Sequence, residues 1–152
     1  MKQGGYIANK TGNNLEHFVE NILKDEGYKF IEKNKFVSSI LDIKIYTKQL
    51  YMCNGIYNSK IYCDFILFHP TKHPNCLVIE SKWQQSSGSV DEKFPYLVLN
   101  IKELYPYKTI IVLDGGGYKK GAEIWLRQQV DNSLLGVYNM TEFRICVNKG
   151  KI

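Results

Sequence analysis

The stretch that decides the fold is Cys76–Trp83, CLVIESKW, in which an apolar run leads directly into an acid, a serine and a lysine. A nearly continuous apolar run of this length is typical of a central strand with both faces covered. Alternate residues of a strand share a face, so Glu80, Lys82 and, if the strand continues, Gln84 project to one side and Ser81 to the other. Isolated charges are costly to bury, so Glu80 and Lys82 are expected to be paired, to bind a metal or to lie at a site opening.

The preceding segment, Ile61–Phe68, is rich in aromatic and β-branched residues and is predicted to be a strand. It carries one acid, Asp64, among apolar neighbours. A short loop, 69–75, joins the two segments, so we expect them to pair and to bring Asp64 beside Glu80. The alternative is a structural salt bridge between Lys82 and one of these acids, because short acid-x-lysine strings often arise by chance.

A helix is predicted from about Asn14 to Glu26, where apolar residues recur at helical spacing. Asn13 and Glu16 have the spacing of a capping box, and Gly27 is a natural stop. Glu16 lies at the flank of the apolar stripe, whereas Glu20 lies further round and is expected to be solvated.

The rest of the chain alternates helices and strands. The patterns predict a second helix at 89–104 that Pro95 kinks or begins, a buried strand at 109–113, a third helix at 119–130 and a short final strand near 143–147. The order α-β-β-β-α-β-α predicts a mixed α/β (α+β) fold with a central mixed sheet flanked by helices. We expect one domain over residues 1–152.

The composition is typical of a globular protein and is compatible with a polyanionic partner. The formal net charge is +5, the isoelectric point is about 8.9, and all positive charge except Arg127 and Arg144 comes from lysine. Lysine suits phosphate contacts, whereas bidentate reading of guanine favours arginine. No apolar run approaches the roughly 20 residues that span a bilayer, and no secretory signal is visible, so we expect a cytoplasmic protein that does not bind membranes.

The cysteines form no CxxC pair and are expected to be reduced. A zinc site built from His69, His73 and Cys76 is an alternative, but a second cysteine pair is lacking and these residues lie in a loop that contains prolines. A polar hairpin loop is the preferred interpretation. Gly115–Gly117 does not fit a nucleotide-binding motif and is interpreted as a strand-to-helix turn near the substrate.

The order of these features resembles that of the PD-(D/E)XK nucleases, a superfamily that includes many restriction endonucleases and Holliday-junction resolvases. The N-terminal helix carries an acid in Thr11–Glu16, Asp64 lies on the hairpin strand, and Glu80-Ser81-Lys82 follows sixteen positions later. The resemblance covers roughly residues 11–130, and the stretch 80–96 looks most like small type II restriction endonucleases. Cys63 replaces the proline that usually precedes the aspartate.

The resemblance implies a metal-dependent active site. Asp64 and Glu80 would hold Mg²⁺, with Mn²⁺ as a substitute and the backbone carbonyl of Ser81 as a further ligand. Lys82 would orient and help deprotonate the attacking water and stabilise the developing charge. The pKa of Lys82 is expected to be a compromise between the nearby acids and burial.

Four further residues are candidates by the same resemblance. Glu16 matches the helix acid that contacts the metal through water, although simple helix capping is an equal alternative. Gln84 shares the catalytic face and is a candidate for contact with the scissile phosphate. Gln85 and Lys93 are candidates for DNA contacts, and a solvated lysine is the alternative for Lys93.

The function that follows is a Mg²⁺-dependent DNA endonuclease, restriction-like, acting on double-stranded DNA. Cleavage of both strands would need a homodimer or a partner subunit. A Holliday-junction resolvase or repair nuclease acting on branched DNA is the second hypothesis, and a non-catalytic nucleic-acid-binding module is the third.

Overall fold

The computed structural model describes the backbone of residues 3–152 and the side chains from residue 13 onward. Its helices are α1 (Gln3–Asp25), α2 (Phe94–Glu103), α3 (Lys120–Gln128) and α4 (Met140–Asn148), with 3-10 turns η1 (Val37–Ser39) and η2 (Asp91–Lys93). Its strands are β1 (Lys29–Phe30), β2 (Ile45–Lys48), β3 (Tyr51–Asn54), β4 (Lys60–Tyr62), β5 (Phe65–His69), β6 (His73–Trp83), β7 (Thr109–Asp114) and β8 (Leu134–Tyr138).

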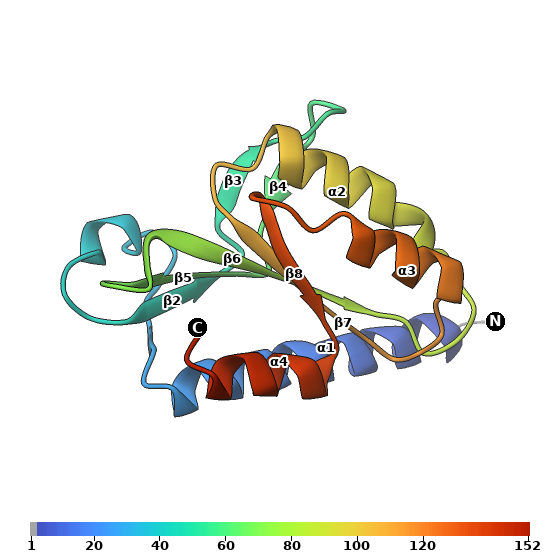
Figure 1. Ribbon diagram of the computed structural model, residues 1–152, viewed down its shortest axis with the longest axis horizontal. Helices are drawn as coiled ribbons and strands as arrows, with labels where there is room; N and C mark the ends of the chain where they lie inside the picture. Colours follow the sequence, from blue (N-terminus) through green and yellow to red (C-terminus); the bar gives the residue numbers. More distant parts are fainter. Residues whose placement is uncertain (1–2) are drawn as a thin grey trace.

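Six strands form one mixed sheet in the order β1-β2-β5-β6-β7-β8. β5 runs antiparallel to both of its neighbours, whereas β6, β7 and β8 are parallel to one another. Figure 1 shows α1 and α4 on one face of this sheet and α2 and α3 on the other. The predicted mixed sheet flanked by helices is confirmed.

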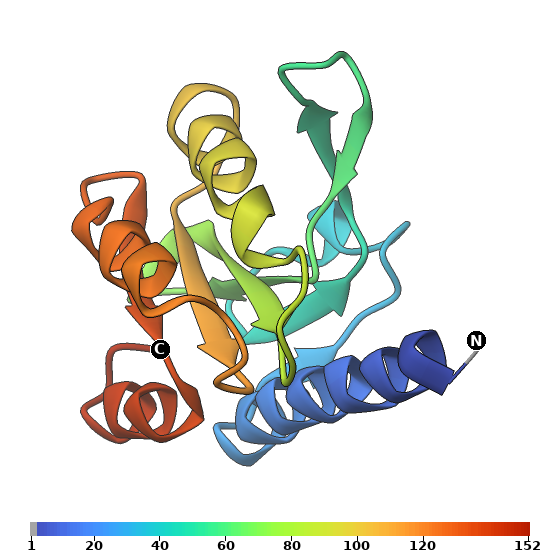
Figure 2. The same ribbon diagram turned by 90° about the vertical axis from the view of Figure 1, so that its right-hand side faces the viewer.

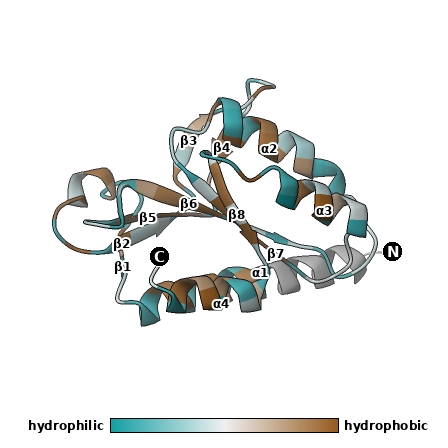
Figure 3. Ribbon diagram, in the orientation of Figure 1, coloured by the Kyte–Doolittle hydropathy of each residue, from teal (hydrophilic) through white to brown (hydrophobic). Residues whose placement is uncertain are grey.

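β6 lies in the middle of the sheet because both of its faces are covered. Leu77 and Ile79 belong to the core cluster beneath α1, whereas Val78 packs into a cluster on the opposite face. All three are at most 1% exposed, which confirms the central position predicted from the apolar run. In Figure 3, β7 and β8 also carry mostly hydrophobic residues, and α2 and α3 carry both hydrophobic and hydrophilic residues.

The predicted strand at 61–68 is two strands. β4 pairs with β3 in a separate hairpin, and β5 joins the main sheet. The chain breaks its pairing at Cys63 and Asp64, where it passes from the hairpin to the sheet. Asp64 therefore lies at a bend at the start of β5, which is where a side chain can turn away from the regular alternation of a strand.

The N-terminal helix begins earlier than predicted. α1 already starts at Gln3, so Asn13 lies inside the helix and the predicted capping box with Glu16 is wrong. The spacing of Ser89 and Glu92 also predicts a capping box, and this prediction is wrong because no side chain caps η2 or α2. Pro95 lies in the first turn of α2, where its missing N–H costs no helical hydrogen bond.

The final strand predicted near 143–147 is wrong, since these residues belong to α4. Asn139 and Glu142 form a complete capping box that starts this helix. The last strand lies just before it, in β8, which had not been predicted.

Two further observations concern the whole described chain. All four cysteines are free, as expected. Among the described helices, none combines the length and apolar character needed to cross a membrane.

Candidate active site

Asp64, Glu80 and Lys82 meet where β5 begins and β6 ends. The pairing of Phe65 with Ile79 places Asp64 directly opposite Glu80 on the neighbouring strand. The ammonium of Lys82 lies 3.2 Å from Asp64 Oδ2 and 2.9 Å from Glu80 Oε2. Since both oxygens lie within hydrogen-bond distance of the same nitrogen, the two carboxylates face one common point.

Asp64 is held in place by Ser81. The backbone N–H of Ser81 donates to Asp64 Oδ2 at 2.8 Å, and its hydroxyl donates to the same oxygen at 3.1 Å. The carboxylate therefore ties the beginning of β5 to the end of β6 and is oriented by three donors, the third being Lys82. The predicted ligand role of the Ser81 carbonyl stays a prediction.

Glu80 is the most deeply buried member of the site, with only 3% of its surface exposed. The hydroxyl of Tyr105, just after α2, donates to Glu80 Oε1 at 3.2 Å. Burial raises the pKa of Glu80 to about 7, although the neighbouring Lys82 favours its charged form. Nothing in the spacing of the sequence had pointed to Tyr105.

Lys82 is held as an ammonium. Burial alone would lower its pKa, but Glu80 and Asp64 outweigh burial and raise the pKa above its ordinary value. The two acids therefore affect the pKa of Lys82 more strongly than burial does. Its side chain remains 27% exposed, so the charged group can still be reached from outside.

The side chain of Gln84 lies on the expected face, but its amide group already makes hydrogen bonds within the protein. Its side chain is 5% exposed; Nε2 donates to the carbonyl of Gly117, and Oε1 accepts from the N–H of Asp91. Asp91 in turn accepts from the N–H of Lys119 at the start of α3. Gln84 therefore connects the end of β6 to the turn before α3 and to the start of η2, and the structure does not show its amide free for a phosphate.

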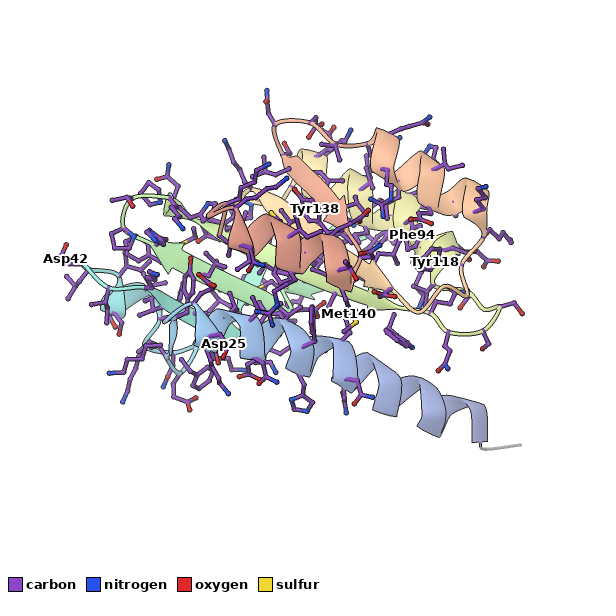
Figure 4. The ribbon with its side chains drawn as sticks, turned by 60° about the horizontal axis from the view of Figure 1, so that its bottom comes forward. Asp25, Asp42, Phe94, Tyr118, Tyr138 and Met140 are labelled. Atoms are coloured by element: carbon purple, nitrogen blue, oxygen red, sulfur yellow. The ribbon has the colours of Figure 1, made fainter. Side chains whose placement is uncertain are left out.

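The glycine turn after β7 packs against the segment that follows Lys82. A Cβ on Gly115 would lie 2.4 Å from the carbonyl oxygen of Gln84, and a Cβ on Gly117 would lie 2.4 Å from the carbonyl carbon of Gln85. Figure 4 shows Tyr118, next in the chain, near Phe94 of α2, in whose core cluster it packs. The turn thus supports the segment that continues from β6.

Replacing Gly117 with alanine is expected to destabilise the protein by about 1–3 kcal/mol, because the added methyl group meets backbone atoms that cannot rotate away. Chemical denaturation of the two proteins measures this difference. Gly121 in α3 is the matched control, since a Cβ there meets nothing within 4 Å. Gly121→Ala should be neutral or stabilising by ~0.5–1 kcal/mol, and equal losses in both variants would contradict the close-packing argument.

Glu16 is not brought together with the three central residues. Its carboxylate lies 3.7 Å from the ammonium of Lys48. The helix that carries it, α1, covers the sheet face to which Ile79 points, whereas Glu80 and Tyr105 lie on the opposite face. Its catalytic role stays a prediction. Glu20, expected to be solvated, instead accepts a 2.8 Å hydrogen bond from Tyr46, so that expectation is wrong.

Lys93 lines a pocket of about 310 Å³ together with Lys82, Ser81 and Trp83. Its exposed side chain lies at the start of α2. This position is consistent with a contact to DNA that enters the pocket. Gln85 is also exposed, in the loop after β6, and its predicted DNA contact stays a prediction.

The zinc alternative has no support among the described residues, which contain no group of three histidine, cysteine or acidic side chains able to hold a metal ion. His69 Nδ1 accepts from the N–H of Lys72, and His73 Nε2 bonds the carbonyl of Lys151. The imidazole of His69 thus holds the hairpin loop, whereas that of His73 joins the start of β6 to the C-terminal residues.

Comparison with known proteins agrees with this geometry. A family model described as a PD-(D/E)XK nuclease superfamily domain matches residues 7–151. Searches of curated proteins and of solved structures found no similar chain. Members of this superfamily are generally nucleases, and they typically use divalent metals and act on nucleic acid. Since the match spans almost the entire sequence and the sheet brings Asp64, Glu80 and Lys82 together, the chain belongs to the PD-(D/E)XK nuclease superfamily.

Proposed function

We propose that this protein is a Mg²⁺-dependent DNA endonuclease that hydrolyses phosphodiester bonds at Asp64, Glu80 and Lys82. The observation that carries the proposal is the convergence of two carboxylates, from neighbouring strands, on one ammonium. A binding module without catalysis has no need for this set. A structural salt bridge alone does not explain why Glu80, whose charge burial disfavours, is retained.

The donor atoms fit a magnesium ion. Mg²⁺ is bound in proteins by one or two carboxylates and keeps several water molecules, and Asp64 and Glu80 supply such a pair. The carbonyl of Ser81 is a further candidate ligand, and Mn²⁺ is the expected substitute. A divalent cation held there would neutralise negative charge on the scissile phosphate.

The residues of the chain divide the remaining work. Lys82, as an ammonium, donates hydrogen bonds to the attacking water or to the oxygens on which negative charge develops. Asp64 is fixed by Ser81 and needs little reorganisation during the reaction. Lys93 offers a positive charge to a neighbouring phosphate, and Gln84 maintains the position of the strand end.

Two kinds of DNA are candidates as substrate. The likeness of residues 80–96 to small type II restriction endonucleases favours a duplex with a short recognition sequence, which would require a homodimer or a partner subunit to cut both strands. The lysine-rich composition, with only two arginines, favours a branched or frayed DNA recognised by shape.

The test is cleavage of linear plasmid, supercoiled plasmid and a four-way junction, each with Mg²⁺ and with EDTA. We expect cleavage of at least one substrate with Mg²⁺ and none with EDTA. Discrete bands from linear DNA would identify a restriction-like enzyme, and cutting confined to the junction would identify a nuclease for branched DNA. Absence of metal-dependent cleavage on all three would leave the non-catalytic binding module as the function.

A further inference from the structure

The β3–β4 hairpin displays a pair of tyrosines that no other part of the fold covers completely. Tyr51 and Tyr62 face each other across the two strands, with ring centroids 5.9 Å apart in an edge-to-face arrangement. They are 49% and 46% exposed. Figure 2 shows this hairpin projecting from the sheet beside α2. Two half-exposed aromatic rings on a projecting element form an available contact surface.

The hairpin is fixed to the body of the protein at its tip. The N–H of Ile56 donates to the side chain of Asn100 in α2 at 2.9 Å. The ring of Tyr57 stacks on that of Tyr96, with centroids 5.1 Å apart. Because the tip is anchored on α2, Tyr51 and Tyr62 are presented in a defined position.

That position is next to the reaction centre. Tyr62 precedes Asp64 by two residues. At roughly 3.3 Å per residue in a strand, their Cα atoms are within about 7 Å. Stacked nucleotides of one DNA strand are about 3.4 Å apart, so this distance corresponds to about two nucleotides.

The charge of the segment suits a polyanion. Residues 49–62 contain no acidic side chain, and Lys60 adds a positive charge. A nucleic-acid strand bound at Asp64 and Glu80 can therefore continue along the hairpin without meeting a carboxylate of the hairpin's own residues.

We infer that Tyr51 and Tyr62 form a stacking platform for an unpaired base within about two nucleotides of the scissile phosphate. This rests on the proposed nuclease function and names its substrate class, a DNA with unpaired bases beside the cut. In a fully paired duplex each base is already stacked between its neighbours, so an aromatic ring gains a base face only where pairing is interrupted. Stacking of a base on an aromatic side chain is strong and independent of sequence.

The tyrosine pair also has a structural use, because cross-strand aromatic pairs stabilise hairpins. Leucine keeps an apolar contact across the strands but offers no ring, and tryptophan keeps the ring. The variant Tyr51→Leu/Tyr62→Leu is therefore compared with Tyr62→Trp. Phe30→Leu is the matched control, since Phe30 is an aromatic residue of similar exposure, 43%, that lies in β1 and outside the hairpin.

The measurement is fluorescence anisotropy in EDTA with two labelled DNAs of equal length, one fully paired and one with a splayed, unpaired arm. The wild-type protein should bind the splayed DNA roughly tenfold more tightly than the duplex. The double leucine variant should lose this preference while its duplex affinity changes less than about twofold, and Tyr62→Trp and Phe30→Leu should retain it. A 2-aminopurine in the unpaired arm should be quenched by the wild-type protein and brighter with the double variant.

A double variant that keeps the full preference, or a Phe30→Leu variant that loses it equally, would overturn the platform. Unfolding temperatures of the variants show whether the hairpin change disturbs the remaining fold, and a loss of duplex and splayed affinity together also counts against the platform. Binding in EDTA does not depend on catalysis. If the preference depends on the tyrosines but no DNA is cut with Mg²⁺, the nuclease function fails while the platform stands. If DNA is cut with Mg²⁺ but the preference for splayed DNA is absent, the nuclease function stands while the platform fails.

Discussion

Lys82→Met is expected to lower the rate of Mg²⁺-dependent cleavage by about 10²–10⁴-fold, while the affinity for DNA changes little. Methionine keeps the length of the side chain but removes the ammonium that lies between Asp64 and Glu80. An interaction that strengthens as charge develops in the transition state contributes to kcat rather than to substrate binding. Single-turnover cleavage with excess protein measures the chemical step, and anisotropy in EDTA measures binding.

Lys108→Met is the matched control for this variant. It makes the same change of charge in an exposed side chain just before the start of β7, whereas Leu113, the β7 partner of Lys82, lies near the end of that strand. Its cleavage rate should stay within about threefold of wild type, because one distant surface charge affects only the encounter with DNA. Equal cleavage rates for Lys82→Met and the wild-type protein would remove Lys82 from the active site.

Loss of fold must be separated from loss of chemistry in the lysine variant. Removing the ammonium leaves Glu80 buried without its closest positive charge, so Glu80 should hold its proton to still higher pH. At pH 6 this carboxyl is mostly protonated in the folded wild-type protein already, since its pKa is about 7. Denaturation at pH 6 should therefore show the variant folded, and a cleavage defect measured on that folded protein is a defect of the reaction.

The sequence was sufficient to predict the centre of this site. An apolar run places β6 in the middle of a sheet, and the alternation of a strand then fixes Glu80 and Lys82 on one face. A short connection forces the preceding strand to pair with β6, which brings Asp64 opposite Glu80. These conclusions depend on local periodicity and short loops, which are properties that a single sequence displays.

The support around this centre depends on tertiary packing and could not be predicted in the same way. Tyr105 reaches Glu80 only because α2 lies across that face of the sheet, and Gln84 is occupied because the turn at Gly117 folds back onto it. Glu16 lies in the predicted helix and at the flank of its apolar stripe, but in the structure its carboxylate pairs with Lys48. A helical wheel gives the direction of a side chain from its own helix and does not say which strand it meets.

The C-terminal error has a different cause. The short apolar pattern of residues 143–147 predicts a strand, but such a pattern does not distinguish a short strand from a short buried helix. The capping box of Asn139 and Glu142 was present in the sequence and would have indicated the helix. The polar residues at the helix start are therefore better evidence for this element than its apolar residues.

The second large effect concerns stability, and it has the opposite sign to the effect on catalysis. Glu80→Gln is expected to make the protein more stable than wild type by on the order of 3 kcal/mol at pH 8 in EDTA. The pKa of Glu80 is about 7 in the folded protein, against an ordinary value of 4.5. Glutamine has nearly the same shape as the protonated carboxyl and never ionises, so the variant lacks the cost of burying the charge.

The pH dependence follows from the same shift. Below about pH 4.5 the carboxyl is protonated in both the folded and the unfolded chain, so the two proteins should be equally stable. As the pH rises towards 7 the unfolded wild-type chain loses this proton before the folded protein does, and wild-type stability falls relative to the variant. Above about pH 8 the difference is complete and constant. Urea denaturation of both proteins from pH 4 to pH 8 measures it.

Taking the difference between the two proteins isolates Glu80 from the other groups that titrate in this range. Burial lowers the pKa values of His69 and His73. Burial alone would raise the pKa of Glu20, but the hydrogen bond from Tyr46 and the charge of Lys48 lower it. These three groups contribute equally to both curves, so their contributions cancel. Adding Mg²⁺ at pH 8 should then stabilise the wild-type protein, by about 2.7 kcal/mol at a hundred times its Kd, and have a much smaller effect on the variant. A variant that is no more stable than wild type at pH 8 would show that burial of the Glu80 charge does not destabilise the protein. A variant that gains as much stability from Mg²⁺ as the wild-type protein would show that Glu80 is not a ligand. Glu80 would then be a structural partner of Lys82.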